Sequence, residues 1–402
     1  MKATMNRILL FNCSNDMALA ADGVTYRPPK NILRMEEQLS MLPLWWAEDG
    51  DAVMVSDVDE ANNFLASLHK QFKLPEIVTV DERYGYERLC KDTGRMFVPC
   101  PWGWSRAVAK KFRHFGVPEE LIPTEKQLAE WRRLSSRKFA VEYMEELLPE
   151  LDTCGVGDAV VGREMKYWES VENCMSDFSV GDKKIFKSPW SSSGRGVFVV
   201  SDSLDSTVES RLRGYVRAQG GFVSDKYYDK SLDFAVEYEV KKDGSVDFLG
   251  YSVFSAAENG KYGYNMVGEQ AQLRELIDRT LADVKVGADL IDRIRQCHST
   301  QLAHCLGGIY TGCVGIDMLV AKEKGRTVVH PCIEINLRMN MGILALHLSR
   351  LPERLLPLDG LARGADLCSV NLNSPISTPL TPIRINGFNA RLDAGRFILS
   401  FS

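Results

Sequence analysis

The chain has 402 residues, of which 45% are hydrophobic and 26% charged, a composition that excludes a disordered or fibrous protein. At about 150 residues per domain, this length predicts two or three domains. Its net charge of -5, from 49 basic and 54 acidic residues, disfavours nucleic acid as a partner. No apolar stretch reaches the roughly 20 residues that cross a bilayer, and the ten cysteines are scattered, so we expect a cytoplasmic protein with reduced thiols and no membrane partner.

The N-terminal region alternates apolar and helical segments. Residues 7–11 and 52–57 are short apolar runs that end in polar residues, and a helical stretch separates them. Residues 105–115 have the residue mix of a further helix. This alternation predicts an α/β domain over residues 1–120.

A pair of helices is predicted next. Thr124 and Gln127 have the spacing of a capping box, in which each side chain binds the other residue's backbone N–H. Phe139, Tyr143 and Leu147 then recur every fourth residue, and Pro149 is expected to end the second helix.

The rest of the chain mixes strands and helices. Residues rich in β-branched and aromatic side chains predict antiparallel strands at 184–187, 196–200, 234–240 and 248–254. Periodic leucines predict one long helical block over 269–305, and two more strands should flank a turn at 324–326. The fold class is therefore α/β followed by α+β.

Cys297, His298, His304 and Cys305 place four zinc-type ligands within nine residues. Structural zinc sites usually take their ligand pairs from separate elements joined by a tight turn. We therefore favour core packing or partial exposure for this group.

A small, hydroxyl-rich loop between two predicted strands is the first candidate functional element. Lys187 ends one strand, and the loop to Gly196 contains four serines, a glycine and Arg195. Glycine lets backbone N–H groups approach an anion, and lysine supplies a point charge, so the loop suits phosphate. A plain hairpin loop is the alternative. A Walker phosphate loop and a Rossmann glycine fingerprint are both absent from the sequence.

The second candidate element is a carboxylate pair. If residues 312–336 form a hairpin about the turn at 324–326, Asp317 and Glu334 lie opposite each other, and Asn336 shares the face of Glu334. Facing like charges destabilise a strand pair unless a cation lies between them. Two carboxylates and an amide oxygen suit Mg²⁺ better than zinc. Solvated carboxylates, with Arg338 in a surface salt bridge, are the alternative.

Over residues 125–345 these motifs resemble the ATP-grasp superfamily, which holds Mg-ATP between two α+β subdomains and mostly joins a carboxylate to an amine. The resemblance implies a small subdomain at 121–230 and a large subdomain at 231–402, after a pre-ATP-grasp-like α/β domain at 1–120. It implies that Asp317, Glu334 and Asn336 bind Mg²⁺, with Mn²⁺ as a substitute, and that Lys187, Arg195 and Arg338 offset charge during phosphoryl transfer. It also implies that ATP contacts the following residues: Lys138, Lys187, Ser191, Ser192, Ser193, Gly194, Gly196, Asp225, Lys226, Tyr227 and Asp233.

The resemblance implies an ATP-dependent, ADP-forming ligase that joins a small carboxylate to an amine through an acyl phosphate. A small-molecule kinase of the same fold, or a nucleotide-binding protein without turnover, is the alternative, and a homodimer is left open. Two positions depart from the family pattern, because Leu337 replaces a common proline and Gly315 stands where some members have arginine. Residues 258–265 are a candidate substrate segment or an ordinary turn, and Asn12, Asn15 and Asp16 either face the substrate or cap a helix.

Overall fold

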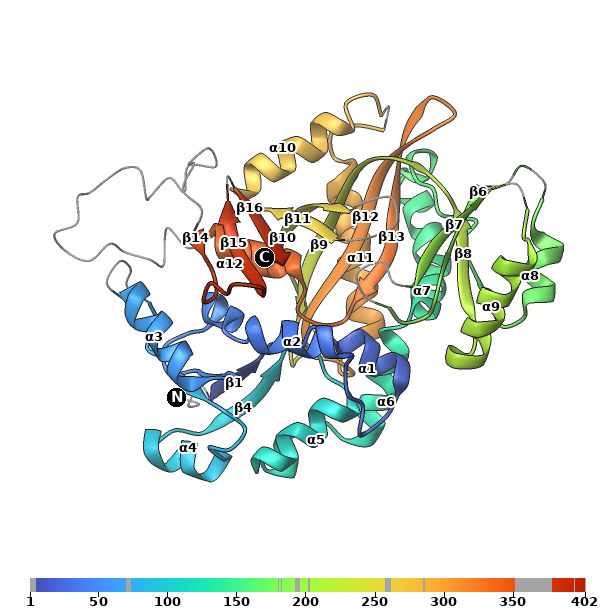
Figure 1. Cartoon of the computed structure of the whole chain (residues 1–402). Helices are drawn as coiled ribbons and strands as arrows, with labels where there is room; N and C mark the ends of the chain where they lie inside the picture. Colours follow the sequence, from blue (N-terminus) through green and yellow to red (C-terminus); the bar gives the residue numbers. More distant parts are fainter. Residues whose placement is uncertain are drawn as a thin grey trace. The chain divides into compact units, whose positions relative to one another are not determined.

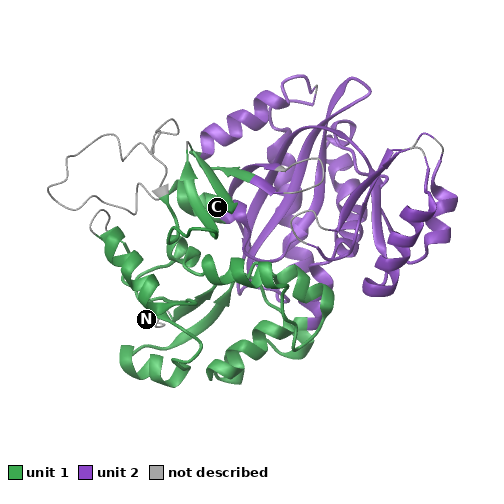
Figure 2. Ribbon diagram, viewed as in Figure 1, with its two compact units in different colours: residues 1–128, 264–269, 344–402 green, residues 129–263, 270–343 purple. Residues whose placement is uncertain are grey.

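The computed structural model describes residues 5–69, 74–179, 181, 183–191, 196–201, 203–256, 262–284, 286–350, 378–393 and 395–401. Figure 2 shows the chain divided into two compact units. Unit 1 comprises residues 1–128, 264–269 and 344–402, and unit 2 comprises residues 129–263 and 270–343. Within the described ranges, no helix is both long and apolar enough to cross a membrane.

Unit 1 is built on a parallel sheet with the strand order β3-β2-β1-β4 (Figure 1). Its strands are mostly buried, as expected for parallel strands with helices on both faces. The predicted N-terminal α/β domain is therefore confirmed. The strands are β1 (Asn6–Leu10), β2 (Ala52–Met54), β3 (Val78–Val80) and β4 (Phe97–Pro101), and the helices are α1 (Asn15–Ala21), α2 (Lys30–Gln38), α3 (Val58–His69), α4 (Tyr86–Thr93) and α5 (Arg106–Phe115), with 3₁₀ turns at Leu42–Trp46 and Glu119–Leu121.

Unit 1 also contains a small antiparallel sheet from the end of the chain. Here β11 (Tyr262–Met266) pairs with β16 (Arg396–Phe401), which pairs with β15 (Phe388–Asp393), which pairs with β14 (Thr378–Pro379). Trp45 donates its indole N–H to the carbonyl of Leu380 at 2.6 Å. This bond ties the C-terminal strands to the N-terminal region within one unit.

Unit 2 contains two antiparallel sheets. The smaller has the order β5-β8-β6-β7, and the larger segment has the order β13-β12-β9-β10. The predicted antiparallel strands and the hairpin at 324–326 are confirmed, and Lys324 and Gly325 make the turn with positive φ. The strands are β5 (Lys166–Trp168), β6 (Lys183–Lys187), β7 (Val197–Ser201), β8 (Phe222–Lys226), β9 (Asp229–Val240), β10 (Val246–Ala256), β12 (Gly312–Glu323) and β13 (Arg326–Asn336).

Helices cover the smaller sheet of unit 2 on one face. Buried residues from α8 (Val171–Asp177) and α9 (Ser206–Gln219) pack with Phe186 of β6 and Phe222 of β8 in a single apolar cluster. Because alternate strand residues face this cluster, Lys187 lies on the opposite face from Phe186.

The predicted helix pair is α6 (Glu125–Leu134) and α7 (Arg137–Thr153). The capping box is confirmed, because Thr124 donates its backbone N–H to Gln127 Oε1 at 2.9 Å and Gln127 returns its own to Thr124 Oγ1. The prediction that Pro149 ends the second helix is wrong, since α7 continues to Thr153. Pro149 removes one backbone donor, but the fully buried Leu151 holds the last turn against the core.

The single helical block predicted at 269–305 is also wrong. It consists of two helices, α10 (Gln270–Thr280) and α11 (Leu290–Leu306). Gly287 lies between them with φ of +112°, a conformation that no right-handed helix accommodates. Periodicity alone missed this break because apolar residues continue through it.

The helix α11 packs in the core of unit 2 through Cys297 and His298, so the core reading of these residues is confirmed. His298 is fully buried, and its ring nitrogens contact the Tyr143 hydroxyl at 2.9 Å and the Pro331 carbonyl at 3.0 Å. Burial lowers the pKa of His298 to about 4. The folded chain therefore holds this ring neutral at neutral pH.

This burial predicts a loss of stability in acid. Between pH 6.5 and 4 the unfolded histidine binds a proton and the folded one does not, so the free energy of unfolding falls as pH falls. The contribution of His298 between pH 7 and pH 5 is about 2 kcal/mol. Urea unfolding should show a shallower pH dependence in His298→Gln than in the parent chain. His114→Gln, at an exposed histidine of α5, is the control, and equal slopes in all three proteins would contradict the prediction.

Candidate active site

Polar side chains gather on one face of the larger sheet of unit 2. Directly opposed residues of antiparallel strands point to the same side, so the register defines two rows across the four strands. The first row contains two opposed carboxylates, and the second places Asn336 and Glu237 on either side of Gly315. From β13 to β10 the rows read Glu334, Asp317, Ala235, Ser252 and Asn336, Gly315, Glu237, Gly250.

The predicted opposition of Asp317 and Glu334 is confirmed by this register. Burial, together with the facing carboxylates of Glu334 and Glu237, raises the pKa of Asp317 well above its usual value, while Arg338 and Asn336 oppose that rise. A cation placed between these carboxylates would relieve their repulsion. The donor set of Asp317, Glu334 and Asn336 therefore fits a hard divalent ion such as Mg²⁺. In the described part of the chain, no three His, Cys, Asp or Glu residues form a metal-binding group, so the amide oxygen of Asn336 is needed to complete this set.

Glu237 is a third carboxylate on the same face, and the sequence analysis missed it. It is 1% exposed, and it accepts hydrogen bonds from Ser252 Oγ at 2.9 Å and Asn340 Nδ2 at 2.8 Å. Burial raises the pKa of Glu237 to about 7. Asn340 in turn accepts the backbone N–H of Ile343 at the start of α12 (Met341–Ser349). These hydrogen bonds fix the side chain of Glu237, which belongs to the second row, and that of Asn340.

Two arginines supply positive charge beside the carboxylates. Arg338 donates to Asn336 Oδ1 at 2.9 Å. Arg137, at the start of α7, is 5% exposed and donates to Glu334 Oε2 at 2.8 Å. Its other terminal nitrogen donates to the Ser188 carbonyl and to Ser191 Oγ, both at 2.7 Å. Arg137 therefore joins the carboxylate pair to the serine-rich loop.

Lys187 lies at the end of β6, where the sequence predicts it, and is 4% exposed. Burial lowers the pKa of Lys187, and Arg137 lowers it further, whereas Asp225 and Glu334 act in the opposite direction. The lysine thus shares the electrostatic environment of both the arginine and the carboxylates. A buried ammonium in this setting is a strong partner for an incoming phosphate.

The first and last residues of the loop after Lys187 contact each other. Ser188 donates its backbone N–H to the Gly196 carbonyl at 2.8 Å, and a Cβ on Gly196 would lie 2.0 Å from Ser188 Oγ. Only glycine fits at that position. Ser191 is held by Arg137. The predicted phosphate contacts Ser192, Ser193, Gly194 and Arg195 lie outside the described residues.

Asp225, one of the predicted ATP contacts, is buried near the end of β8 with 1% exposure. Its Oδ2 lies 2.9 Å from Nε2 of the fully buried His330, and its Oδ1 accepts the backbone N–H of Lys226. Lys226 forms an ion pair with Glu323, and Tyr227 lies under the Lys183 ammonium. His330 and the backbone of Lys226 thus fix the position of the Asp225 side chain.

Two other predicted contacts form ion pairs with residues outside the carboxylate set. Lys138 is on α7 directly after Arg137, yet its side chain is 44% exposed, and it pairs with Glu169 at 3.0 Å. Asp233 is on β9 opposite Leu319 of β12 and pairs with Lys230. The basic residue of α7 that reaches the carboxylates is Arg137. Helix periodicity does not distinguish Arg137 from its neighbour Lys138, because only packing decides which of the two side chains is buried.

The departure at Gly315 has a structural reason. A Cβ at this position would lie 2.2 Å from Asn340 Nδ2 and 2.5 Å from Glu237 Oε2. The glycine therefore makes room for the buried network of Glu237 and Asn340, in the place where an arginine would displace it.

Gly315→Ala should consequently destabilise the protein. We expect a loss of about 1–3 kcal/mol in the free energy of unfolding, because the methyl group overpacks a buried polar network. Chemical denaturation measures this loss. Gly214→Ala, within α9 and with open space around its Cβ, is the matched control and should be neutral or stabilising. Equal stability of the two variants would contradict the argument.

Comparison with known proteins gives matches of structure and none of sequence. No family model and no curated protein matches the chain. Similar solved structures include biotin carboxylase from Campylobacter jejuni, with 15% identity over 85% of this chain and 67% of that chain and a TM-score of 0.46. N5-carboxyaminoimidazole synthetase from Staphylococcus aureus, in complex with ADP, is 11% identical over 89% and 81% of the two chains, with a TM-score of 0.40.

An L-amino acid ligase from Bacillus licheniformis is 14% identical over 89% of this chain and 76% of that chain, with a TM-score of 0.37. Identities of 15% or less and TM-scores below 0.5 do not assign this chain to a family. Its own strand pairings confirm the predicted fold class of an N-terminal α/β domain followed by α+β sheets.

Proposed function

We propose that the chain is an ATP-dependent ligase of ATP-grasp type, which joins a carboxylate to an amine and releases ADP and phosphate. The observation that carries this proposal is the opposition of Asp317 and Glu334, with Asn336 beside them, next to three buried or half-buried cations. Such a site suits a metal–triphosphate complex, because the carboxylates would bind the metal ion and the basic side chains would bind the phosphates. The cations are Arg137, Lys187 and Arg338.

In the proposed reaction, a carboxylate oxygen of the first substrate attacks the γ-phosphorus of ATP, and the bond to the β-phosphate oxygen breaks to release ADP. The amine nitrogen of the second substrate then attacks the acyl carbon of the mixed anhydride. The phosphate leaves with the bonding electrons, and the nitrogen loses a proton to solvent. No covalent bond to the protein is needed.

The residues of this chain act by binding and charge neutralisation. Lys187 and Arg338 would donate to phosphate oxygens, and Arg137 would orient both Glu334 and the loop at Ser191. Asp317, Glu334 and Asn336 would hold Mg²⁺, which screens the triphosphate when bound. We also propose that Lys226 and Tyr227 border the adenine base of ATP, and that Asp225, through His330, holds the end of their strand in place. The two subdomains would divide near residue 230.

The test is ATP turnover with Mg²⁺ in the presence of pooled carboxylates and amines, with ADP and free phosphate measured separately. Equal amounts of ADP and phosphate that require one compound from each pool would support the ligase. ADP without phosphate would replace it by a small-molecule kinase. No ADP in any pool, with measurable ATP binding, would replace it by a nucleotide-binding protein.

A further inference from the structure

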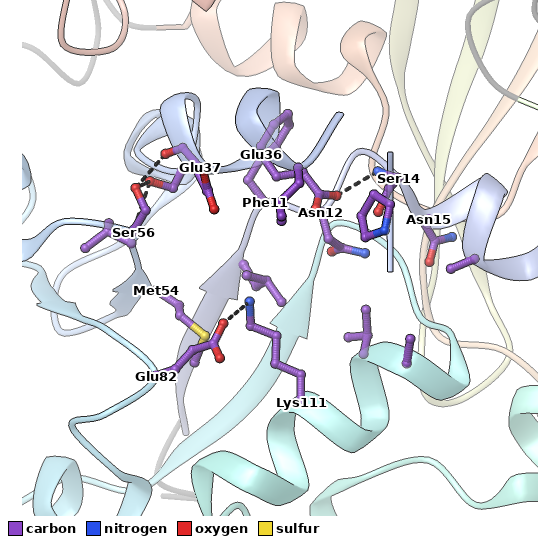
Figure 3. A pocket seen from close by; sticks show the side chains of 18 of the residues that line it. Phe11, Asn12, Ser14, Asn15, Glu36, Glu37, Met54, Ser56, Glu82 and Lys111 are labelled. Atoms are coloured by element: carbon purple, nitrogen blue, oxygen red, sulfur yellow. Dashed lines mark hydrogen bonds and ion pairs between the residues drawn. The ribbon is translucent and has the colours of Figure 1, made fainter. Parts of the chain in front are cut away.

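Unit 1 contains a cavity at the carboxyl ends of its parallel strands (Figure 3). Its volume is about 410 Å³, and it is lined by the residues that follow β1, β2 and β3 and by parts of α2 and α5. Small-molecule sites have volumes in this range, and open α/β sheets bind ligands at this edge. All residues that line the cavity belong to unit 1.

The charges around this cavity favour a cation over an anion. Both basic side chains of its lining are already neutralised, because Arg83 pairs with Asp81 at 2.5 Å and Lys111 pairs with Glu82 at 2.6 Å. Two more carboxylates, Glu36 and Glu37, also line the cavity. Neither forms an ion pair with any residue in the described ranges. The lining therefore has a net negative charge.

In open α/β sheets an anion often binds at the turn after the first strand, and here the Glu36 carboxylate of the protein takes that position. Figure 3 shows the Glu36 carboxylate reaching the turn after β1, where it accepts the backbone N–H of Ser14 at 2.8 Å. Asn12 closes the neighbouring crevice, since its amide bonds to the carbonyl and the N–H of Gly103. A phosphate or carboxylate at this turn would meet Glu36 instead of free donors.

Glu36 is poorly compensated within the protein. It lines the cavity together with the apolar side chains of Phe11 and Leu33, and burial raises its pKa, while the hydrogen bonds from Ser14 and the charge of Lys111 oppose that rise. Met54 and Val55 complete an apolar wall. A ligand with an amino group and an apolar body would match both parts of this lining.

We propose that this cavity binds the amine substrate, with its amino group on Glu36, Glu37 at the rim and its apolar body against Phe11, Leu33 and Met54. This inference rests on the proposed ligase function and names the class of its second substrate: a small primary amine with an aliphatic or aromatic body. Of the sequence candidates at this site, Asn12 and Asn15 both line the cavity, Asn15 from the start of α1.

The test is calorimetric binding to the full chain without nucleotide, with three probes of one length: n-pentylamine, 1-pentanol and pentanoate. We expect n-pentylamine to bind at least about tenfold more tightly than 1-pentanol, and pentanoate more weakly than either, because a charge-assisted hydrogen bond forms only with the amine. Glu36→Gln should bring n-pentylamine to the affinity of 1-pentanol. Pentanoate binding as tightly as the amine, or absence of amine binding, would overturn the proposal.

A second variant and a control guard against effects on folding. Glu37→Gln changes an exposed side chain at the rim and should weaken amine binding less than Glu36→Gln does. Glu87→Gln, at an exposed glutamate of α4 away from the cavity, should leave binding unchanged. Equal amine affinity in Glu36→Gln and Glu87→Gln would overturn the proposal.

The same experiment separates this inference from the ligase proposal. Glu334→Gln should retain n-pentylamine binding, because the cavity belongs to unit 1. Amine binding without any ADP formation would overturn the ligase and keep the site. Amine-dependent ADP formation with the same KM for the amine in Glu36→Gln would keep the ligase and overturn the site.

Discussion

Glu334→Gln should lower ATP turnover by about 100- to 1000-fold while leaving the fold intact. The substitution keeps the shape of the side chain and its bond from Arg137, but it removes one of the two charges that would hold the metal. Half-buried Glu334 repels Asp317, so removing its charge should not destabilise the sheet. Steady-state ADP release measures the loss, and urea unfolding measures the fold.

Asn336→Ala extends this prediction, because it removes the amide oxygen that completes the metal-binding set. We expect a loss of similar size, together with a higher Mg²⁺ concentration at half-maximal rate. Glu275→Gln, on the exposed face of α10, is the matched control and should keep full activity. Turnover near the parent rate in Glu334→Gln or Asn336→Ala would refute the metal assignment.

Lys187→Met should lower turnover by about 100-fold or more, with the same folded structure. The lysine is 4% exposed, close to Arg137 and Glu334, and no other lysine of β6 is buried. Methionine has nearly the same length and no charge, so it fills the space but does not bind phosphate. ATP affinity and turnover, measured separately, show whether the charge acts in binding or in transfer.

Lys183→Met is the control for this variant. Lys183 lies four residues earlier on the same strand, is exposed and contacts only the ring of Tyr227 among the described aromatic side chains. Its substitution should change turnover less than about twofold, as is usual for an exposed residue away from the chemistry. A similar loss in both variants would show that β6 contributes general charge rather than a specific contact.

The carboxylate pair was predicted from local rules, as two residues at equal distances from a turn at 324–326. In the structure Asp317 lies seven residues before Lys324 and Glu334 lies nine residues after Gly325, and a register shift between Asp317 and Leu319 brings the two carboxylates opposite each other. The same reasoning places Lys187 at a strand end next to a glycine-containing loop. In both cases the elements are adjacent in sequence, so no distant contact is needed.

Glu237 and Arg137 were not predictable in this way. Glu237 and Glu239 are two residues apart on β9 and therefore face the same side of the sheet. Glu237 is buried because Gly315 and Gly342 leave room for its side chain. Arg137 and Lys138 are neighbours at the start of α7, and only the packing of α7 in unit 2 selects which one contacts Glu334. Both choices depend on segments about 80 to 200 residues apart.

The sequence by itself determined the fold class, the capping box of α6, and the hairpin of β12 and β13 that contains both carboxylates, because periodicity and turn chemistry act over short distances. Only the tertiary structure decided where α7 and α10 end, that Asp225 is held by His330, and that Glu36 occupies the anion position after β1. In each case, segments distant in sequence bury charged and apolar groups, and this burial sets the free energy of each side chain. The neighbouring residues along the chain do not determine it.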